Sequence, residues 1–273
     1  MIAFPFAKVN LGLRILGRRP DGYHNIESVL YPVAWKDSLE FLPSAHQSFR
    51  SYGLPVERNG QIDLCERAYR MIKEKYALPA LDIALLKSIP AGAGLGGGSS
   101  DAAAMLTALN KSFGLNMAEV ELNEMAARIG SDCPFFLQKR PAFVYERGER
   151  MEEFPLSLDR YQFLIAYPGI AVSTADAYRH CRPSGQPLER QRLLAEPPSA
   201  WDDFLVNDFE KSVFEVFPAI AQLKKKIKRM GALYAAMSGS GSAVYGIFRE
   251  APMAMDAAQT LGLPLEYVYS GNQ

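Results

Sequence analysis

Residues 90–101 read Pro-Ala-Gly-Ala-Gly-Leu-Gly-Gly-Gly-Ser-Ser-Asp, and this run constrains the fold more than any other segment. The apolar segment 81–89 precedes it, and the alanine-rich segment 102–109, a strong helix former, follows it. Glycine permits positive φ angles and a close approach of the backbone to a ligand. A glycine loop that opens onto a helix directs N–H groups and the positive end of the helix dipole to one place. The sequence therefore predicts a strand, a phosphate-binding loop and a helix in succession.

Three other interpretations of this run fit its residues less well. The P-loop pattern ends in Gly-Lys-Ser/Thr, and it fails here because Gly98 is followed by two serines. Residues 92–97 match the spacing G-x-G-x-x-G of dinucleotide-binding sites. No strand with an acidic residue follows about 20 positions later, so a nicotinamide-dependent oxidoreductase is a weaker alternative. A flexible linker has no reason to lie between a strand and a helix.

Composition narrows the class of protein. The chain has 273 residues, 48% of them hydrophobic, which is enough for a large core in one or two domains. Its 30 basic and 30 acidic residues give no net charge that would attract nucleic acid or an anionic membrane. We find no apolar stretch of about 18 residues and no secretion signal, and expect a cytoplasmic protein. Three cysteines without Cys-x-x-Cys spacing indicate reduced thiols and no metal site: Cys65, Cys133 and Cys181.

Hydrophobic periodicity predicts a mixture of strands and helices. Strands are expected at 2–16, 27–34, 37–42, 81–89, 142–145, 162–167, 232–237, 243–248 and 265–269. Helices are expected at 62–76, 100–113, 117–129, 212–230 and 252–261, with a long surface loop at 183–200. No regular β-α-β alternation is present, so the predicted fold class is α+β. The acidic, proline-bearing stretch 151–157 predicts a boundary between two domains, residues 1–152 and 153–273.

Three parts of the chain, in order, resemble the motifs of the GHMP kinases, the family of galactokinase, homoserine kinase, mevalonate kinase and phosphomevalonate kinase. They are residues 4–24, the glycine run 90–100 and the glycine–serine segment 237–242. The resemblance implies two α+β domains with the active site in the cleft between them, and ATP-dependent phosphorylation of an alcohol. Residues 7–11 and 19–24 are similar to members that act on a cytidine-diphosphate-linked alcohol.

The residue pattern makes the glycine run a phosphate-binding loop, and the resemblance assigns it to ATP binding. Its residues are Pro90, Ala91, Gly92, Ala93, Gly94, Leu95, Gly96, Gly97, Gly98, Ser99 and Ser100. Either serine can hold a Mg²⁺ ion that bridges phosphates. We see no carboxylate cluster for a dedicated metal site, and expect Mg²⁺ to arrive with ATP. The segment 63–68 departs from the family pattern near the adenine, so the adenine pocket is expected to differ in detail.

Asp132 and Lys8 are the expected catalytic residues. Asp132 lies between a helix end and an apolar run, where a carboxylate can be held rigidly and partly desolvated, as a general base requires. The residues alone also allow a purely structural role, in which Asp132 accepts the amides of its own turn. Lys8 interrupts an apolar strand, and by itself could face solvent at a sheet edge. The resemblance makes Asp132 the base and places the Lys8 cation beside it, where it stabilises negative charge.

Four further residues are expected to bind the substrate. Tyr23 and His24 are an adjacent aromatic ring and imidazole, suited to stack on a base and to hydrogen-bond its edge, or else an ordinary loop pair. The resemblance assigns them to the cytosine and makes Tyr178 the opposite wall. Asn10 is two residues from Lys8, on the same strand face, and is an expected polar contact. The segment 238–242 could be a simple hairpin, which the resemblance places at the cleft.

Besides the oxidoreductase, the sequence leaves two alternatives to this function. A sister kinase would act on a small alcohol such as homoserine or mevalonate, which needs no stacking wall of the kind that Tyr23 offers. A non-catalytic nucleotide sensor would not need both Lys8 and Asp132. We expect a small-molecule substrate and no nucleic acid, membrane or obligate protein partner.

Overall fold

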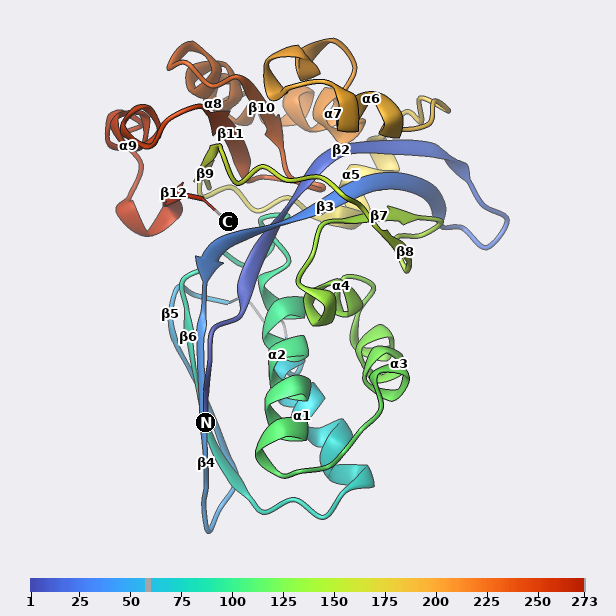
Figure 1. The fold of residues 1–273 in the computed structure, drawn as a ribbon, viewed down its shortest axis with the longest axis vertical. Coiled ribbons are helices and arrows are strands. Elements are labelled where there is room, and N and C mark those ends of the chain that lie inside the picture. Colours follow the sequence, from blue (N-terminus) through green and yellow to red (C-terminus); the bar gives the residue numbers. More distant parts are fainter. Residues whose placement is uncertain (57–59, 273) are drawn as a thin grey trace. The chain divides into compact units, whose positions relative to one another are not determined.

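A computed structural model describes residues 1–56 and 60–272 of the chain. Helices and strands are mixed without regular alternation, and the described strands form three four-stranded sheets (Figure 1). Contacts between residues divide the chain into two compact units. The first comprises Met1–Ala7, Trp35–Ala91 and Gly96–Lys139, and the second comprises Lys8–Ala34, Gly92–Leu95 and Arg140–Gln273. The predicted α+β class is confirmed.

The first unit is a sheet with helices packed on it. Its strand order is β1 (Ile2–Ala3), β4 (Ser38–Pro43), β6 (Leu81–Lys87) and β5 (Ser48–Gly53), antiparallel except for the parallel pair β5–β6. Its helices are α1 (Leu64–Lys75), α2 (Gly97–Ser112), α3 (Glu119–Ile129) and α4 (Cys133–Gln138). Alternate residues of β6 are buried, because one face of the strand packs in the helix-covered core.

The second unit contains two sheets. One has the order β2 (Phe6–Arg18), β3 (His24–Lys36), β7 (Ala142–Tyr145) and β8 (Arg150–Glu153). The other is antiparallel, in the order β10 (Tyr234–Met237), β11 (Val244–Phe248), β9 (Gln162–Ala166) and β12 (Val268–Gly271). Its helices are α5 (Thr174–His180), α6 (Arg190–Ala195), α7 (Phe209–Val216), α8 (Pro218–Arg229) and α9 (Ala251–Thr260), with 3-10 turns at Pro198–Asp203 and Leu265–Tyr267.

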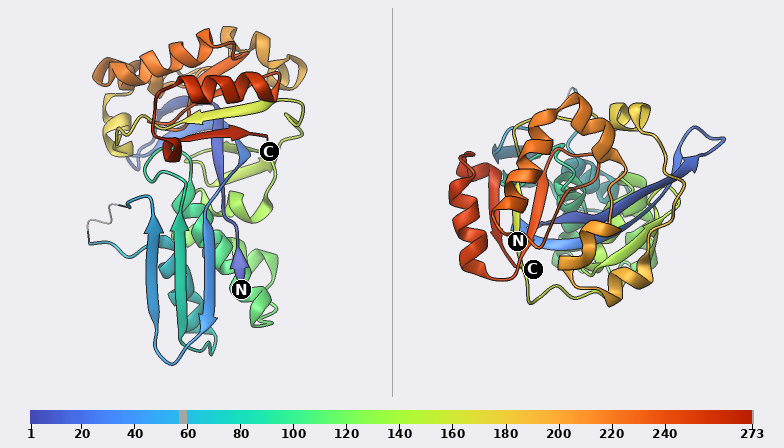
Figure 2. Two further views of the ribbon diagram at one scale, coloured as in Figure 1. Left: turned by 90° about the vertical axis from the view of Figure 1, so that its left-hand side faces the viewer. Right: turned by 90° about the horizontal axis from the view of Figure 1, so that it is seen from above.

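Both faces of the β10–β11–β9–β12 sheet are covered. Helices α8 and α9 lie against one face (Figure 2), where their apolar residues share a core with Leu164 and Val244. On the other face, the Phe163 ring stacks on Tyr31 of β3 with ring centroids 5.6 Å apart. A strand that is buried on both faces does not alternate between apolar and polar residues. This explains why all five residues of β11 are buried and none of them is charged.

Several predicted elements differ from the observed ones. The predicted helix 212–230 is two helices, because Pro218 lacks an N–H to continue α7 and instead begins α8. The predicted loop 183–200 contains α6, whose Leu193 is buried in the core. Residues 265–267 form a 3-10 turn, and the last strand begins at Val268. Four short elements were not predicted: β5, β8, α4 and α5.

The two compact units interleave along the chain. Strands β2 and β3 are each 13 residues long, and each contributes residues to both units. A division at residue 152 into two sequence domains stays a prediction. Among the described residues, we find no helix that is long and apolar enough to cross a membrane.

Candidate active site

The glycine run forms the connection between β6 and the start of α2. Gly92, Gly94 and Gly96 have φ angles of 64°, 79° and 73°, a region that side chains disfavour. A Cβ atom at Gly94 would lie 2.0 Å from the carbonyl oxygen of Ser238, which leaves no room for a side chain. Gly96 is the N-cap of α2 and brings no side-chain cap to its first turn. Such a helix start is typical of a phosphate-binding loop.

The side chains of this loop differ in accessibility. Ala91, Gly92 and Gly98 are exposed, whereas Ser100 is buried in the first turn of α2. Ser99 is half-buried, so it is the more accessible of the two serines considered for Mg²⁺. Within residues 1–56 and 60–272, no group of three His, Cys, Asp or Glu side chains is arranged to hold a metal ion.

A buried cluster of charges connects the two ends of the glycine loop within the first unit. Lys87, the last residue of β6, donates from Nζ to Asp37 and, at 2.6 Å, to Asp101 near the N-terminal end of α2. Asp37 also accepts the backbone N–H groups of Ser88 and Ile89, at 2.6 and 2.8 Å. All three charged side chains are at most 3% exposed. They therefore fix where the loop leaves the strand and where it enters the helix.

This cluster was missed from the sequence. The sequence did contain an indication of it. Lys87 continues the alternating buried positions of β6, and a lysine at a buried position requires a partner of opposite charge. Burial raises the pKa of Asp101 well above its usual range, although Lys87 opposes the shift. Burial lowers the pKa of Lys87, but Asp101 and Asp37 outweigh this effect and raise it overall. The lysine is therefore held in its charged form.

Lys8 lies on β2 and does not face solvent, since the residue is only 4% exposed. Its Nζ donates to Asn10 Oδ1 at 2.6 Å and to the carbonyl oxygen of Gly94 at 3.0 Å. Asn10 in turn donates from Nδ2 to Ser28 Oγ at 2.8 Å. The two side chains lie on the same face of β2, as their spacing predicted, and the Lys8 ammonium is fixed beside the glycine loop.

The segment 238–242 is the turn between the antiparallel strands β10 and β11, so the simple hairpin interpretation is correct for its secondary structure. Ser238 Oγ donates to the carbonyl oxygen of Gly94 at 2.8 Å and accepts the N–H of Asn10 at 3.2 Å. The turn therefore also contacts the glycine loop and β2. Asn207, which donates to this turn, was not among the predicted site residues.

Asp132 directly precedes α4. It is the N-cap residue of this helix, but its side chain makes no cap hydrogen bond, so the carboxylate does not serve the role of a helix cap. The next residue, Cys133, is buried and packs near the first turn of α2. Burial raises the pKa of Cys133 to about 11, with a smaller opposing effect from Ser99. The segment that carries Asp132 thus lies against the beginning of the helix that follows the glycine loop.

The predicted substrate-binding aromatic residues form two separate contacts within the second unit. The His24 imidazole stacks on Tyr178, with ring centroids 4.9 Å apart and an angle of 16°. Tyr178 also contacts Phe209 edge-on. Tyr23 is 58% exposed, and the Arg147 guanidinium lies 5.1 Å from its ring centroid. Burial and the nearby Arg18 lower the pKa of His24, which favours a neutral imidazole with one donor and one acceptor.

Comparison with known proteins identifies the family. The model described as GHMP kinases N terminal domain matches residues 63–140, and the model described as GHMP kinases C terminal matches residues 194–259. The chain belongs to the GHMP kinases and is an ATP-dependent kinase of small molecules. This membership excludes the nicotinamide-dependent oxidoreductase that the spacing of residues 92–97 had left open.

Its relatives are named more narrowly. A 4-diphosphocytidyl-2-C-methyl-D-erythritol kinase of Bacteroides thetaiotaomicron is 46% identical over 252 residues, which cover 91% of this chain and 92% of that protein. The kinase of the same name from Parabacteroides distasonis is 45% identical over 250 residues, 92% of each chain. The crystal structure of a 4-(cytidine 5'-diphospho)-2C-methyl-D-erythritol kinase matches with a TM-score of 0.84 at 31% identity, and covers 99% of this chain and 98% of that one.

Proposed function

We propose that the protein phosphorylates the 2-hydroxyl of 4-diphosphocytidyl-2-C-methyl-D-erythritol with ATP, in the non-mevalonate pathway to isoprenoid precursors. The observation that carries this proposal is the 45–46% identity to kinases of that name over more than nine-tenths of both chains. The buried Lys8, fixed beside the glycine loop, agrees with a kinase and has no evident use in a mere nucleotide sensor.

In the proposed reaction, the substrate hydroxyl oxygen forms a bond to the γ-phosphorus of ATP. The bond from that phosphorus to the bridging oxygen breaks, and ADP leaves. Asp132 accepts the hydroxyl proton, and the Lys8 ammonium stabilises the negative charge. Residues 90–100 hold the phosphates through backbone N–H groups, and Mg²⁺ that arrives with ATP would neutralise their charge.

The cytosine of the substrate is proposed to stack on Tyr23 and Tyr178, with His24 reading its edge and Asn10 contributing a polar contact. The His24 imidazole covers one face of Tyr178. A base that stacks on that face must therefore displace His24, and the displaced neutral imidazole could then donate to or accept from the base.

The substrate is tested by ADP release from Mg-ATP with three alcohols in parallel. Turnover is expected with 4-diphosphocytidyl-2-C-methyl-D-erythritol, and none with homoserine or mevalonate. Turnover with either control would retain the kinase mechanism and contradict the proposed substrate. ATP binding without turnover of any of the three would favour the non-catalytic sensor.

The stacking role is tested by Tyr23→Ala. Because stacking of a base on an aromatic ring contributes about 1–3 kcal/mol, we expect KM for the cytidyl substrate to rise about tenfold or more. KM for ATP should not change. Tyr23→Phe keeps the ring and should retain the wild-type value, and Tyr52→Ala removes an equally exposed ring from β5 as a matched control. An unchanged KM in Tyr23→Ala would show that the base binds elsewhere.

A further inference from the structure

We infer that Asn207 is a positioning residue for phosphoryl transfer, because it fixes the backbone on either side of Ser238, which in turn holds the glycine loop and the acceptor of Lys8. This role rests on the proposed function of Lys8 and of residues 90–100. The side-chain hydrogen bonds of Asn207 that the described residues show go to Met237, Gly239 and Phe209, and neither to Lys8 nor to residues 90–100. It acts through the turn that follows β10.

Asn207 is 2% exposed and uses every polar atom of its side chain. Its Nδ2 donates one hydrogen to the carbonyl oxygen of Met237 and the other to that of Gly239, both at 2.8 Å. Its Oδ1 accepts the N–H of Phe209 at 3.0 Å. A primary amide supplies two donors and one acceptor, which this arrangement requires. The residues before and after Ser238 are thereby fixed to the start of α7.

Ser238 transmits this constraint to the reacting groups. Its Oγ donates to the carbonyl oxygen of Gly94 at 2.8 Å, and the Lys8 ammonium donates to the same oxygen at 3.0 Å. The N–H of Asn10 donates to Ser238 Oγ, while Asn10 Oδ1 accepts from Lys8. A shift of Ser238 would therefore displace the glycine loop together with the Gly94 and Asn10 oxygens that accept from Lys8.

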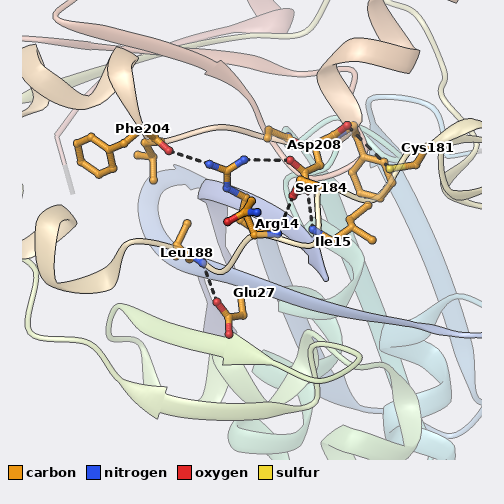
Figure 3. A network of polar contacts seen from close by, with 12 residues as sticks. Arg14, Ile15, Glu27, Cys181, Ser184, Leu188, Phe204 and Asp208 are labelled. Carbon is orange, nitrogen blue, oxygen red and sulfur yellow. Dashed lines mark hydrogen bonds and ion pairs between the residues drawn. The ribbon is translucent and has the colours of Figure 1, made fainter. Parts of the chain in front are cut away.

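The segment that carries Asn207 is anchored to β2 by its neighbour (Figure 3). The Asp208 carboxylate accepts a hydrogen bond from Arg14 at 3.2 Å, from the N–H of Ile15 at 2.8 Å and from Ser184 at 2.6 Å. This carboxylate is 5% exposed, so its bonds are protected from water. Asn207 therefore has a rigid base from which to hold the turn.

The variant Asn207→Asp tests the role with little change in volume. It keeps an acceptor for Phe209, but it directs a second carboxylate oxygen at the carbonyl oxygens of Met237 and Gly239. Because small displacements in an active site cost rate steeply, we expect kcat to fall about 10- to 100-fold and the Kd for ADP to rise. ADP binding is measured by calorimetry, without any acceptor alcohol.

The matched control is Ser212→Ala on α7, which removes a buried hydrogen bond to Phe209 without touching residues 237–242. It is expected to lower Tm and leave kcat and ADP affinity unchanged. If Asn207→Asp likewise lowers Tm alone, Asn207 is only structural and the inference is overturned. Should the wild type fail to phosphorylate the cytidyl alcohol, the proposed substrate fails, but the ADP affinities still decide the role of Asn207.

If Asn207→Asp does not fold, Ser238→Ala decides between the outcomes. It removes the hydrogen bond to Gly94 and leaves Asn207 and its contacts intact. Weaker ADP binding and a lower kcat are expected, and wild-type values for both would overturn the inference. Where both single variants fold, the double variant should lose little more than either one, because the two residues act in series.

Discussion

The variant Asp132→Asn is expected to lower kcat about a thousandfold with little change in either KM. Asparagine has the shape of aspartate but cannot accept the proton of the attacking hydroxyl, and a general base contributes about 10²–10⁴ to the rate. Since the Asp132 side chain makes no cap hydrogen bond to α4, the substitution should leave that helix intact. The measurement is steady-state ADP release with Mg-ATP and the cytidyl alcohol.

A control for this substitution is Asp82→Asn on β6. Asp82 forms an ion pair with Arg50 and is more than a third exposed, and no catalytic role is proposed for it. The kcat of Asp82→Asn should equal that of the wild type. If Asp132→Asn also turns over within a few-fold of the wild type, Asp132 is not the base and the proton goes directly to solvent or phosphate.

The variant Lys87→Met is expected to reduce the free energy of unfolding by about 3–5 kcal/mol, because it leaves two buried carboxylates without their cation. Asp37 retains the N–H groups of Ser88 and Ile89, but Asp101 loses the ammonium that donates to its carboxylate, whose Oδ1 is already buried without a hydrogen bond. Urea denaturation at pH 7.5 measures the change. The surface variant Lys75→Met, which breaks an exposed ion pair with Glu121, should change stability very little.

The stability lost in Lys87→Met, measured as the free energy of unfolding relative to the wild type, is expected to become smaller as the pH falls. Burial already raises the pKa of Asp101, and removal of Lys87 would raise it further. The folded variant then binds a proton that the unfolded chain, with the ordinary Asp pKa, does not bind above about pH 4. Its stability must therefore increase between pH 7.5 and pH 5.5. A deficit that is the same at both values would mean that the carboxylates carry no buried charge to be neutralised.

Much of the glycine loop was predictable because its causes are local. Positive φ angles at Gly92, Gly94 and Gly96 require residues without a Cβ atom, and the alanine-rich segment after them forms a helix by its own propensity. The shared face of Lys8 and Asn10 follows from the two-residue period of a strand. Where a local rule was overlooked, as with Pro218 inside the predicted helix 212–230, the prediction was wrong.

The partners of these residues were beyond the reach of local rules. The hydrogen bond from Ser238 to Gly94 joins positions 144 residues apart, and Lys87 meets Asp37 across 50 residues. The stack of His24 on Tyr178 likewise joins the start of β3 to α5, which no sequence period connects. Such pairs depend on which strands and helices lie next to one another in the folded chain. The periodicity of a single segment does not predict these neighbours.

The sequence by itself determined the α+β class, the phosphate-binding loop with its helix, and, through its motifs, the family. These depend on backbone sterics and on side-chain period, both of which act over a few residues. Only the tertiary structure decided that Lys8 is buried, that Lys87 is enclosed by two carboxylates, and that Asn207 holds the turn around Ser238. Burial and partner are properties of the packed chain, because they depend on neighbours that folding brings from distant positions.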